Sequence, residues 1–379
     1  MSRGRVERLT RTGRRSVPDP RGLRKRVATT HNRLGHILRI AVLLCGTTMF
    51  ARAQTYNLVH LGFSGNSPTG QINNLGQVVG YNNLANTAFL YSGGVVTSLG
   101  VSYGYARGIN SVGQVIVYDL SSHSYLASPP YTSWTDLGTL GGGDFYAHAI
   151  NDSGTVVGSG HTISGSVHAF MNFNGTMTDL GSIFSDSDAR SINNSGQIVG
   201  DGHISNILGY YTRAFQMVNG TMTDLDPAYQ NYDMSATAIN DAGQFVVNTD
   251  KAWCSASLAT RSARPSQKHP CRGPSMYVLR YSAGGIITNL GSLGGPTAYG
   301  LGINSYGDVV GQSDTANGAQ HAFLYTRGAM TDLNSHAILN ARGWTFLQAW
   351  SINDFGQIVG QGIGPAGQDE MVVLTPVPN

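Results

Sequence analysis

The stretch INDFGQIVG, at Ile352–Gly360, occurs three times in this chain with only its middle residues changed. INNSGQIVG stands at Ile192–Gly200 and INNLGQVVG at Ile72–Gly80. Looser copies of the signature Ile-Asn-x-x-Gly begin at Ile109, Ile150, Ile239 and Ile303. Asn, then Asn, Asp or Ser, then Gly two residues on is typical of a hairpin turn that Gly closes with a positive φ. Each copy therefore predicts two antiparallel strands joined by a tight turn.

Two further strands are expected after each hairpin. The third begins at Thr87 (TAFLY), His168 (HAFMN), Arg213 (RAFQM) and His321 (HAFLY), with looser copies from Ser124, Ser275 and Glu370. The fourth follows a Gly-centred turn and begins at Val96, Trp134, Met177, Met222, Ile287 and Met330. Four short strands in each unit of about 40 residues is the pattern of a β-propeller blade.

The number of strands indicates how the ring closes. The chain has seven hairpins and seven third strands, but only six fourth strands follow them. The segment YNLVHLG at Tyr56–Gly62 ends in Leu-Gly like the others, so we expect it to complete the last blade and remove the exposed edges. The prediction is an all-β, seven-bladed β-propeller over residues 54–375. Its expected blades are residues 68–100, 103–138, 145–181, 188–226, 235–291, 297–334, and 345–374 with 55–61.

The first 53 residues have the form of a signal peptide with a long basic n-region. They hold thirteen Arg and Lys against two acidic residues, then an apolar run at Ile37–Phe50 and the small-x-small sequence Ala51-Arg52-Ala53. We expect cleavage after Ala53 and a secreted or extracellular protein, with the periplasm as an alternative. The alternative reading of the segment is a basic tail that binds nucleic acid.

The chain after residue 53 is acidic and shows no second candidate for a membrane span. It carries eleven Arg and Lys against nineteen Asp and Glu, which disfavours nucleic acid as a partner. We expect a monomer with no membrane span once the signal is removed. No motif for a cofactor or metal is found: GIGPAG at Gly362–Gly367 matches a dinucleotide fingerprint but lacks a following helix.

The repeated motifs resemble those of the HAF-repeat family of extracellular bacterial proteins. The resemblance rests on His168-Ala169-Phe170 and His321-Ala322-Phe323, between Ile-Asn-x-x-Gly hairpins and Met-Thr-Asp-Leu strands, and it covers residues 55–374. It implies export and leaves the biochemical role undefined. Many relatives end in a PEP-CTERM sorting signal, whereas this chain ends at Pro376-Val377-Pro378-Asn379, so sorting by that route is not expected.

One region interrupts the repeat. The step from Ile239 to Ile303 is 64 residues, against 37 to 49 elsewhere, and the extra residues 249–275 hold five of the eleven cations. This insertion in the fifth blade is either a basic lid or a tolerated surface loop. It contains Cys254 and Cys271, which we expect to form a disulfide in an oxidising compartment.

Repeated residues are expected to be scaffold, and unlike residues at equivalent places are the better candidates for a site. The HAF histidine position reads Thr87, Ser124, Arg213, Ser275 and Glu370 in other units, so we expect a structural role for it. Before each Ile-Asn, by contrast, two positions vary. Two residues before Ile, the seven units hold Gly70, Arg107, His148, Arg190, Thr237, Leu301 and Trp350. Four residues before Ile, they hold Pro68, Tyr105, Tyr146, Asp188, Ser235, Tyr299 and Gln348.

By the two-residue period of a strand, both positions should share one face near the mouth of the propeller. The predicted ligand-binding residues are Tyr105, Arg107, Tyr146, His148, Asp188, Arg190, Tyr299 and Trp350. The other interpretation is that these side chains fill gaps between blades and pair with Asp. Arg, His and Tyr around a concave mouth suit an anionic or sugar-like ligand.

The sequence thus predicts an exported, non-enzymatic binding module for a carbohydrate, in particular an anionic glycan, or for an extracellular protein. No catalytic residue is assigned. The first alternative is a propeller glycosidase or polysaccharide lyase, with Tyr146, His148 and Asp188 as acid/base candidates. The second is a structural matrix protein without a small ligand.

Overall fold

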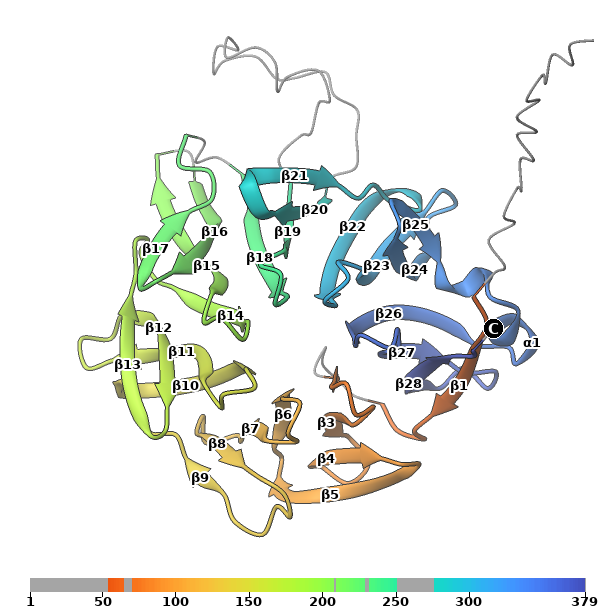
Figure 1. The fold of residues 1–379 in the computed structure, drawn as a ribbon, viewed down its shortest axis with the longest axis horizontal. Coiled ribbons are helices and arrows are strands. Elements are labelled where there is room, and N and C mark those ends of the chain that lie inside the picture. Colours follow the sequence, from red (N-terminus) through yellow and green to blue (C-terminus); the bar gives the residue numbers. More distant parts are fainter. Residues whose placement is uncertain (1–53, 65–69, 208, 229–231, 251–275, 379) are drawn as a thin grey trace, which may run out of the picture. The chain divides into compact units, whose positions relative to one another are not determined.

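The computed structural model describes residues 54–64, 70–207, 209–228, 232–250 and 276–378. In these residues the chain forms seven antiparallel sheets of four strands each, arranged in a ring with the first strand of each sheet innermost (Figure 1). The predicted all-β, seven-bladed propeller is therefore confirmed. The predicted signal peptide and the Cys254–Cys271 disulfide lie outside the described residues, as does the insertion beyond Asp250.

The blades are numbered 1 to 7 in chain order. Blade 1 contains β2 (Gln71–Ile72), β3 (Val78–Asn82), β4 (Thr87–Ser92) and β5 (Val95–Ser102). Blade 2 contains β6 (Tyr105–Ile109), β7 (Val115–Tyr118), β8 (Ser124–Ala127) and β9 (Thr135–Asp136). Blade 3 contains β10 (Gly141–Ile150), β11 (Val156–Thr162), β12 (Val167–Phe173) and β13 (Thr176–Gly181). Blade 4 contains β14 (Asp188–Ile192), β15 (Ile198–Asn206), β16 (Gly209–Val218) and β17 (Thr221–Asp224).

The remaining blades follow the same order. Blade 5 contains β18 (Met234–Ile239), β19 (Phe245–Thr249), β20 (Tyr277–Ser282) and β21 (Ile286–Asn289). Blade 6 contains β22 (Gly294–Ile303), β23 (Val309–Thr315), β24 (Gln320–Thr326) and β25 (Ala329–Asp332). Blade 7 contains β26 (Thr345–Ile352), β27 (Ile358–Ile363), β28 (Asp369–Pro376) and β1 (Tyr56–His60). Helical segments are η1 (Ala283–Gly285), η2 (Leu333–Ser335) and α1 (Ala337–Ala341). None of the helices in the described residues is long and apolar enough to cross a membrane.

The ring is closed by the two ends of the described chain. Strand β1 pairs antiparallel with β28, in a register that sets Tyr56 against Pro376 and His60 against Val372. Blade 7 therefore takes its outermost strand from the N-terminal side, as the Tyr56–Gly62 segment predicts. Pairing satisfies a strand edge that would otherwise be exposed.

The asparagine of Ile-Asn-x-x-Gly is why the motif recurs. Its Oδ1 caps its own turn, as where Asn73 accepts hydrogen bonds from the N–H groups of Leu75 and Gln77 at 3.0 Å. Its Nδ2 donates to the carbonyl of the matching Asn in the next blade. The seven donors, in order around the ring, are Asn73, Asn110, Asn151, Asn193, Asn240, Asn304 and Asn353, whose amide returns to the carbonyl of Asn73. These buried bonds, 2.8–3.3 Å long, tie all seven blades into one closed circle.

The glycine that ends QIVG and the phenylalanine of HAF belong together. A Cβ placed on Gly158 would lie 1.9 Å from the carbonyl oxygen of Tyr146 and 2.8 Å from the ring of Phe170. Gly158 faces Phe170 across β11 and β12, and Gly311 faces Phe323 in the same way in blade 6. Blades 2 and 5 instead place Val117 opposite Tyr125 and Val247 opposite Leu279.

The HAF histidine pairs with the Asp of Met-Thr-Asp-Leu on the neighbouring strand. His168 Nδ1 lies 2.9 Å from Asp179, and His321 Nδ1 lies 2.7 Å from Asp332. Arg213 and Asp224 form the same pair at 2.9 Å. In blade 7 the charges are exchanged, since Glu370 takes the third-strand place and His60 the fourth-strand place, 2.8 Å apart. The structural role expected for this position is to form a cross-strand pair between the two outer strands of the blade.

The strand register corrects the alignment of this position in two blades. In blade 2, Tyr125 faces Val117 as Phe170 faces Gly158, so the residue that matches the HAF histidine is His123 and not Ser124. His123 accordingly lies 3.1 Å from Asp136. In blade 5 the match is Tyr277 and not Ser275, because Leu279 takes the place of the phenylalanine. Both blades lack the Phe that marks the register, so the sequence alignment was displaced by one residue in blade 2 and by two residues in blade 5.

Candidate functional site

The innermost strands of blades 2 to 7 share a β-bulge. In each, the pairing skips one residue between the third and the first position before the Ile of Ile-Asn, as between Ala106 and Gly108. The unpaired residues, one from each blade, are Arg107, His148, Arg190, Thr237, Leu301 and Trp350. A bulge bends the strand and re-aims the extra side chain. The position two before Ile, which differs in every blade, is therefore singled out by the backbone as well.

All six bulge residues line one cavity of about 260 Å³. Gln71 of β2 completes the wall from blade 1, and Ser235 of β18 adds a hydroxyl. Because every blade contributes, the cavity lies on the axis of the ring. We call it the axial cavity. It is smaller than the 300–1,000 Å³ of a typical drug-sized pocket, so it suits one small polar group.

A row of alternating charges forms one side of the axial cavity. His148 Nε2 lies 3.0 Å from Asp188 Oδ1, Arg190 Nη1 lies 3.2 Å from Asp188 Oδ2, and Arg190 Nη2 lies 3.2 Å from Asp201 Oδ1. Neither His148 Nε2 nor Asp188 Oδ1 has a hydrogen-bond partner in the described part of the chain, so the two side chains interact through charge, as an ion pair when His148 is protonated. Ser235 donates a short hydrogen bond to Asp201.

These contacts determine the charge of Asp188 and Arg190. Burial by itself would raise the pKa of the Asp188 carboxyl, but His148 and Arg190 outweigh it and hold that pKa well below its usual range. Burial would lower the pKa of Arg190, and the two carboxylates more than reverse that effect. Arg190 is thus a neutralised cation. It matches the interpretation in which these side chains pair with Asp.

Arg107 differs from Arg190. Its Nη2 donates to the Tyr118 hydroxyl at 3.1 Å and its guanidinium lies 5.1 Å from the centre of that ring. Among the described residues, no carboxylate lies within ion-pairing distance of Arg107, and its Nε is buried without a hydrogen-bond partner. Arg107 is therefore a cation in the cavity wall with unused donor capacity.

The predicted tyrosines lie outside the axial cavity. Tyr105 stacks on Tyr81 at 4.3 Å and on Tyr118 at 5.1 Å, and Tyr146 meets Tyr118 edge-on at 5.6 Å. They form an aromatic row between blades that reaches the cavity only through the contact of Tyr118 with Arg107. Tyr299 pairs with Gln312 on β23 and does not line the cavity.

Trp350 lines the cavity but is 2% exposed, and its Nε1 donates to Gln348 Oε1 at 3.1 Å. A Cβ on Gly70 would lie 2.7 Å from its ring, so Trp350 fills the space between blades 7 and 1.

The structure thus brings four of the eight predicted residues to the cavity wall: Arg107, His148, Arg190 and Trp350. Asp188 contacts two of them, and the three tyrosines stand apart. Sequence reasoning missed four wall residues, Gln71, Ser235, Thr237 and Leu301, and also Asp201, which pairs with Arg190. Asp201 lies on the second strand of blade 4, where no repeated signal distinguished it.

The cavity is poorly arranged for glycoside hydrolysis. A general acid needs a raised pKa, whereas the pKa of Asp188 is held well below its usual range by His148 and Arg190. Asp201 is 3% exposed and engaged by Arg190, so it too is a charge partner. Within the described residues no group of three or more His, Cys, Asp or Glu could hold a metal ion.

Comparisons with known proteins identify the fold. No protein-family model and no curated protein sequence matches the chain. The structure titled "YCF48 bound to D1 peptide" matches with a TM-score of 0.50 at 10% identity, over 86% of this chain and 96% of that one. The β-propeller domain of the Trilobed protease from Pyrococcus furiosus, described as having an open velcro topology, matches with a TM-score of 0.50 at 9% identity, over 86% and 98%.

A putative TolB from Agrobacterium tumefaciens has a TM-score of 0.43 at 13% identity, over 75% of this chain and 95% of that chain. At these identities the likeness shows a common propeller fold and nothing of the site. In this ring β1 pairs with β28 and closes the last blade, which differs from the open velcro topology described for the Trilobed protease propeller.

Proposed function

We propose that this protein is a non-enzymatic binding module whose axial cavity receives an anionic group of a glycan. The observation that carries the proposal is the shared β-bulge. Six blades use the same backbone device at the same place, and each presents a different side chain with it. A scaffold that only needed to close would gain nothing from six unlike bulge residues, whereas a binding site gains specificity from them.

The chemistry of the wall supports an anionic ligand. Arg107 offers a guanidinium without a carboxylate partner, whereas the hydroxyls of Ser235 and Thr237 in the same wall already donate to Asp201 and to the Gly300 carbonyl. A carboxylate bound to Arg107 would make charge-assisted hydrogen bonds. Leu301 and the edge of Trp350 supply an apolar side. An acidic sugar has both a carboxylate and an apolar ring face, and one such unit suits a small cavity.

Further considerations support the wider setting of this proposal. A propeller of the same fold is titled as bound to a peptide, which favours a binding role over a purely structural one. Export, through the segment at residues 1–53, and membership of the HAF-repeat family remain predictions from the sequence. Finding Gln54 as the first residue of the secreted protein by mass spectrometry would support both the signal peptide and its cleavage after Ala53.

The test compares binding of acidic and neutral polysaccharides to the purified protein. Polygalacturonate and alginate should bind, neutral galactan should not, and affinity should fall with added salt. Arg107→Gln removes the charge and keeps much of the side chain, so it should weaken binding by about 10- to 100-fold, the range for a lost charge-assisted hydrogen bond. Arg327→Gln makes the same change of charge at an exposed turn and should bind normally.

Three results would overturn the proposal. One is equal binding by Arg107→Gln and the parent protein. Another is tight binding of neutral galactan alone. The third is release of new reducing ends or unsaturated uronides from the polymers, which would restore the glycosidase or lyase alternative. Arg190→Ala is not a suitable test, since it would leave Asp188 and Asp201 without their shared cation and would impair folding.

A further inference from the structure

The hairpin turns of Ile-Asn-x-x-Gly carry a second set of unlike residues. The position just before each Gly holds, from blade 1 to blade 7, Leu75, Val112, Ser153, Ser195, Ala242, Tyr306 and Phe355. Four consecutive blades around the ring place large apolar side chains there, and these are exposed: Tyr306 75%, Phe355 68%, Leu75 68% and Val112 60%. We call these four residues the apolar arc.

The apolar arc is continuous because its turns are bonded to one another. The N–H of Ser305 donates to Asp354 Oδ1 at 2.8 Å, and the N–H of Asp354 donates to Asn74 Oδ1 at 2.9 Å. Each of these residues directly precedes a member of the arc. Asn73 Nδ2 links blade 1 to blade 2 at 2.9 Å. The four side chains therefore leave neighbouring backbones on one end of the ring.

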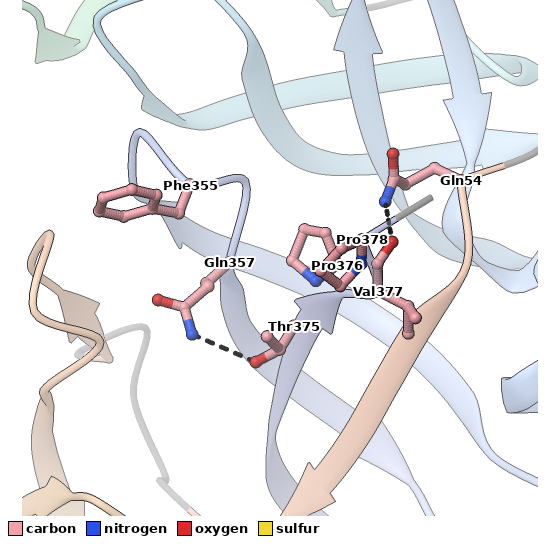
Figure 2. A pocket seen from close by; sticks show the side chains of 7 residues that line it. All are labelled: Gln54, Phe355, Gln357, Thr375, Pro376, Val377 and Pro378. Atoms are coloured by element: carbon pink, nitrogen blue, oxygen red, sulfur yellow. Dashed lines mark hydrogen bonds between the residues drawn. The ribbon is translucent and has the colours of Figure 1, made fainter.

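Two hollows adjoin the arc, one beside each of its aromatic residues. Phe355 lines a hollow of about 480 Å³ together with Pro376 and Pro378. Figure 2 shows Phe355 on the turn between β26 and β27, with the two prolines across from it. Tyr306 lines another hollow, of about 500 Å³, with Arg280 and Arg327. An exposed aromatic beside a hollow is a typical anchor point of a protein interface.

Carboxylates without counter-ions lie next to the arc. Three Asp residues occupy the position two before the Gly of their hairpin turns: Asp354, which directly precedes Phe355, and Asp152 and Asp241 in blades 3 and 5, which flank the arc. No cation of the described residues is within ion-pairing distance of them. They accept hydrogen bonds from adjacent turns instead. Burial opposes ionisation of Asp152 and Asp354, but bonds from Ser111 and Ser305 outweigh it and keep their pKa values below the usual range. Along Val112, Leu75 and Phe355 this end of the ring is thus apolar and negatively charged, whereas the hollow beside Tyr306 also holds the cations Arg280 and Arg327.

We propose that this face docks a protein segment in which apolar or aromatic side chains stand next to Lys or Arg. The apolar side chains would cover the arc and enter its two hollows, while the cations reach Asp354 and the other two carboxylates. A second copy of this chain fits less well, because pairing two such faces would bring uncompensated carboxylates together. The face is separate from the axial cavity: in blades 2, 6 and 7 the arc residue lies five positions after the bulge residue.

The test begins with a phage-displayed library of random dodecapeptides selected on the purified protein. Enriched peptides should combine apolar residues with Lys or Arg, and a synthetic copy of one of them then serves as the probe in fluorescence anisotropy. The double variant Leu75→Ser/Phe355→Ser should bind this peptide about tenfold more weakly or worse. Serine already stands at the matching positions 153 and 195, so these changes should not impair folding. Ile163→Ser, at an 86% exposed residue between β11 and β12, is the matched control and should bind normally.

Charge is tested separately. Asp354→Asn copies Asn74 and Asn194 at the equivalent position, and it should weaken peptide binding and reduce its dependence on salt. Arg107→Gln should leave peptide binding unchanged, which separates this proposal from that of the axial cavity. Enriched peptides without cations, or peptides that bind the double variant as tightly as the parent, would overturn the proposal. So would a parent protein that sediments as a dimer and becomes monomeric in the double variant, since a second copy would then be the occupant.

Discussion

Two positions near the axis, three residues apart in the chain, follow opposite rules: the bulge residue in the innermost strand of blades 2 to 7, and the Asn of the turn that follows that strand. The Asn of Ile-Asn is the same in all seven blades, is buried, and bonds to its counterpart in the next blade. The bulge residue differs from blade to blade and faces the axial cavity. Closing the ring therefore requires the same residue in every blade, because each blade must fit the next, whereas the wall of the cavity is built from a different residue in each blade. The following predictions test this division of labour.

The largest effect is expected at the repeated glycine of blade 3. In Gly158→Ala the new Cβ would lie 1.9 Å from the Tyr146 carbonyl oxygen, which belongs to the inner strand and cannot move alone. We expect a loss in the free energy of unfolding of about 3 kcal/mol or more, the upper range for overpacking. Denaturant unfolding measures it. Gly143→Ala, on the same inner strand with open space around it, is the control and should be nearly neutral. Equal stability of the two variants would refute the packing argument.

A smaller but still severe loss is expected when the Asn circle is cut. Asn193→Ala removes the bond to the Asn240 carbonyl at 3.0 Å and leaves the N–H of Gln197 without its 2.9 Å acceptor. Each buried polar group left unsatisfied costs about 1–3 kcal/mol, so a loss of about 2 kcal/mol or more is expected in the same measurement. Asn317→Ala, in an exposed turn, should change stability by less than about 0.5 kcal/mol. If both substitutions were neutral, the circle would not be what holds the blades together.

The fold could be predicted because its signals are repeated. The seven copies of one hairpin determine the number of blades. The last blade lacks a fourth strand at the C-terminal end, and an extra strand at the N-terminal end supplies it, which determines the closure through β1. The repeat also showed that Asn belongs to the turn. It did not show that Nδ2 reaches the next blade. Capping the turn and bonding to the equivalent Asn of the next blade both require an Asn at the same position, so the sequence cannot distinguish the two roles.

The site was predictable only in part, for a specific physical reason. A strict two-residue period places Tyr105 on the same face as Arg107. Arg107 is itself the bulged residue, so the alternation is broken at that point, and only Arg107 lines the cavity. A bulge changes the pairing by a single residue and has no signature in composition. The apolar arc, by contrast, was visible in the alignment of turns, where Phe355 and Ser195 occupy the same position. Its signal lies in the turns, and an alignment of the strands does not contain it.

The smallest expected effect concerns the charges of the axial cavity and is a change in slope with pH. The pKa of Asp188 is held well below its usual range in the folded protein, and it returns to about 3.9 in the unfolded chain. Above that value its stabilisation is complete. As the pH falls below about 4, the unfolded chain takes up a proton that the folded protein does not, so stability falls with a slope approaching 1.4 kcal/mol per pH unit.

Asp188→Asn should be less stable at pH 7, because Arg190 loses a partner, but its stability should fall less steeply between about pH 4 and pH 2. Denaturant unfolding at a series of pH values measures both quantities. Asp179→Asn, at a half-exposed pair on the outer strands, is the comparison variant, since its carboxylate is not deeply buried and, among the described residues, pairs with His168 alone. If the slope of Asp188→Asn matched that of the parent, the charge row would not stabilise the ring, and a role for Asp188 in orienting Arg190 and His148 toward a ligand would become the better explanation for its position.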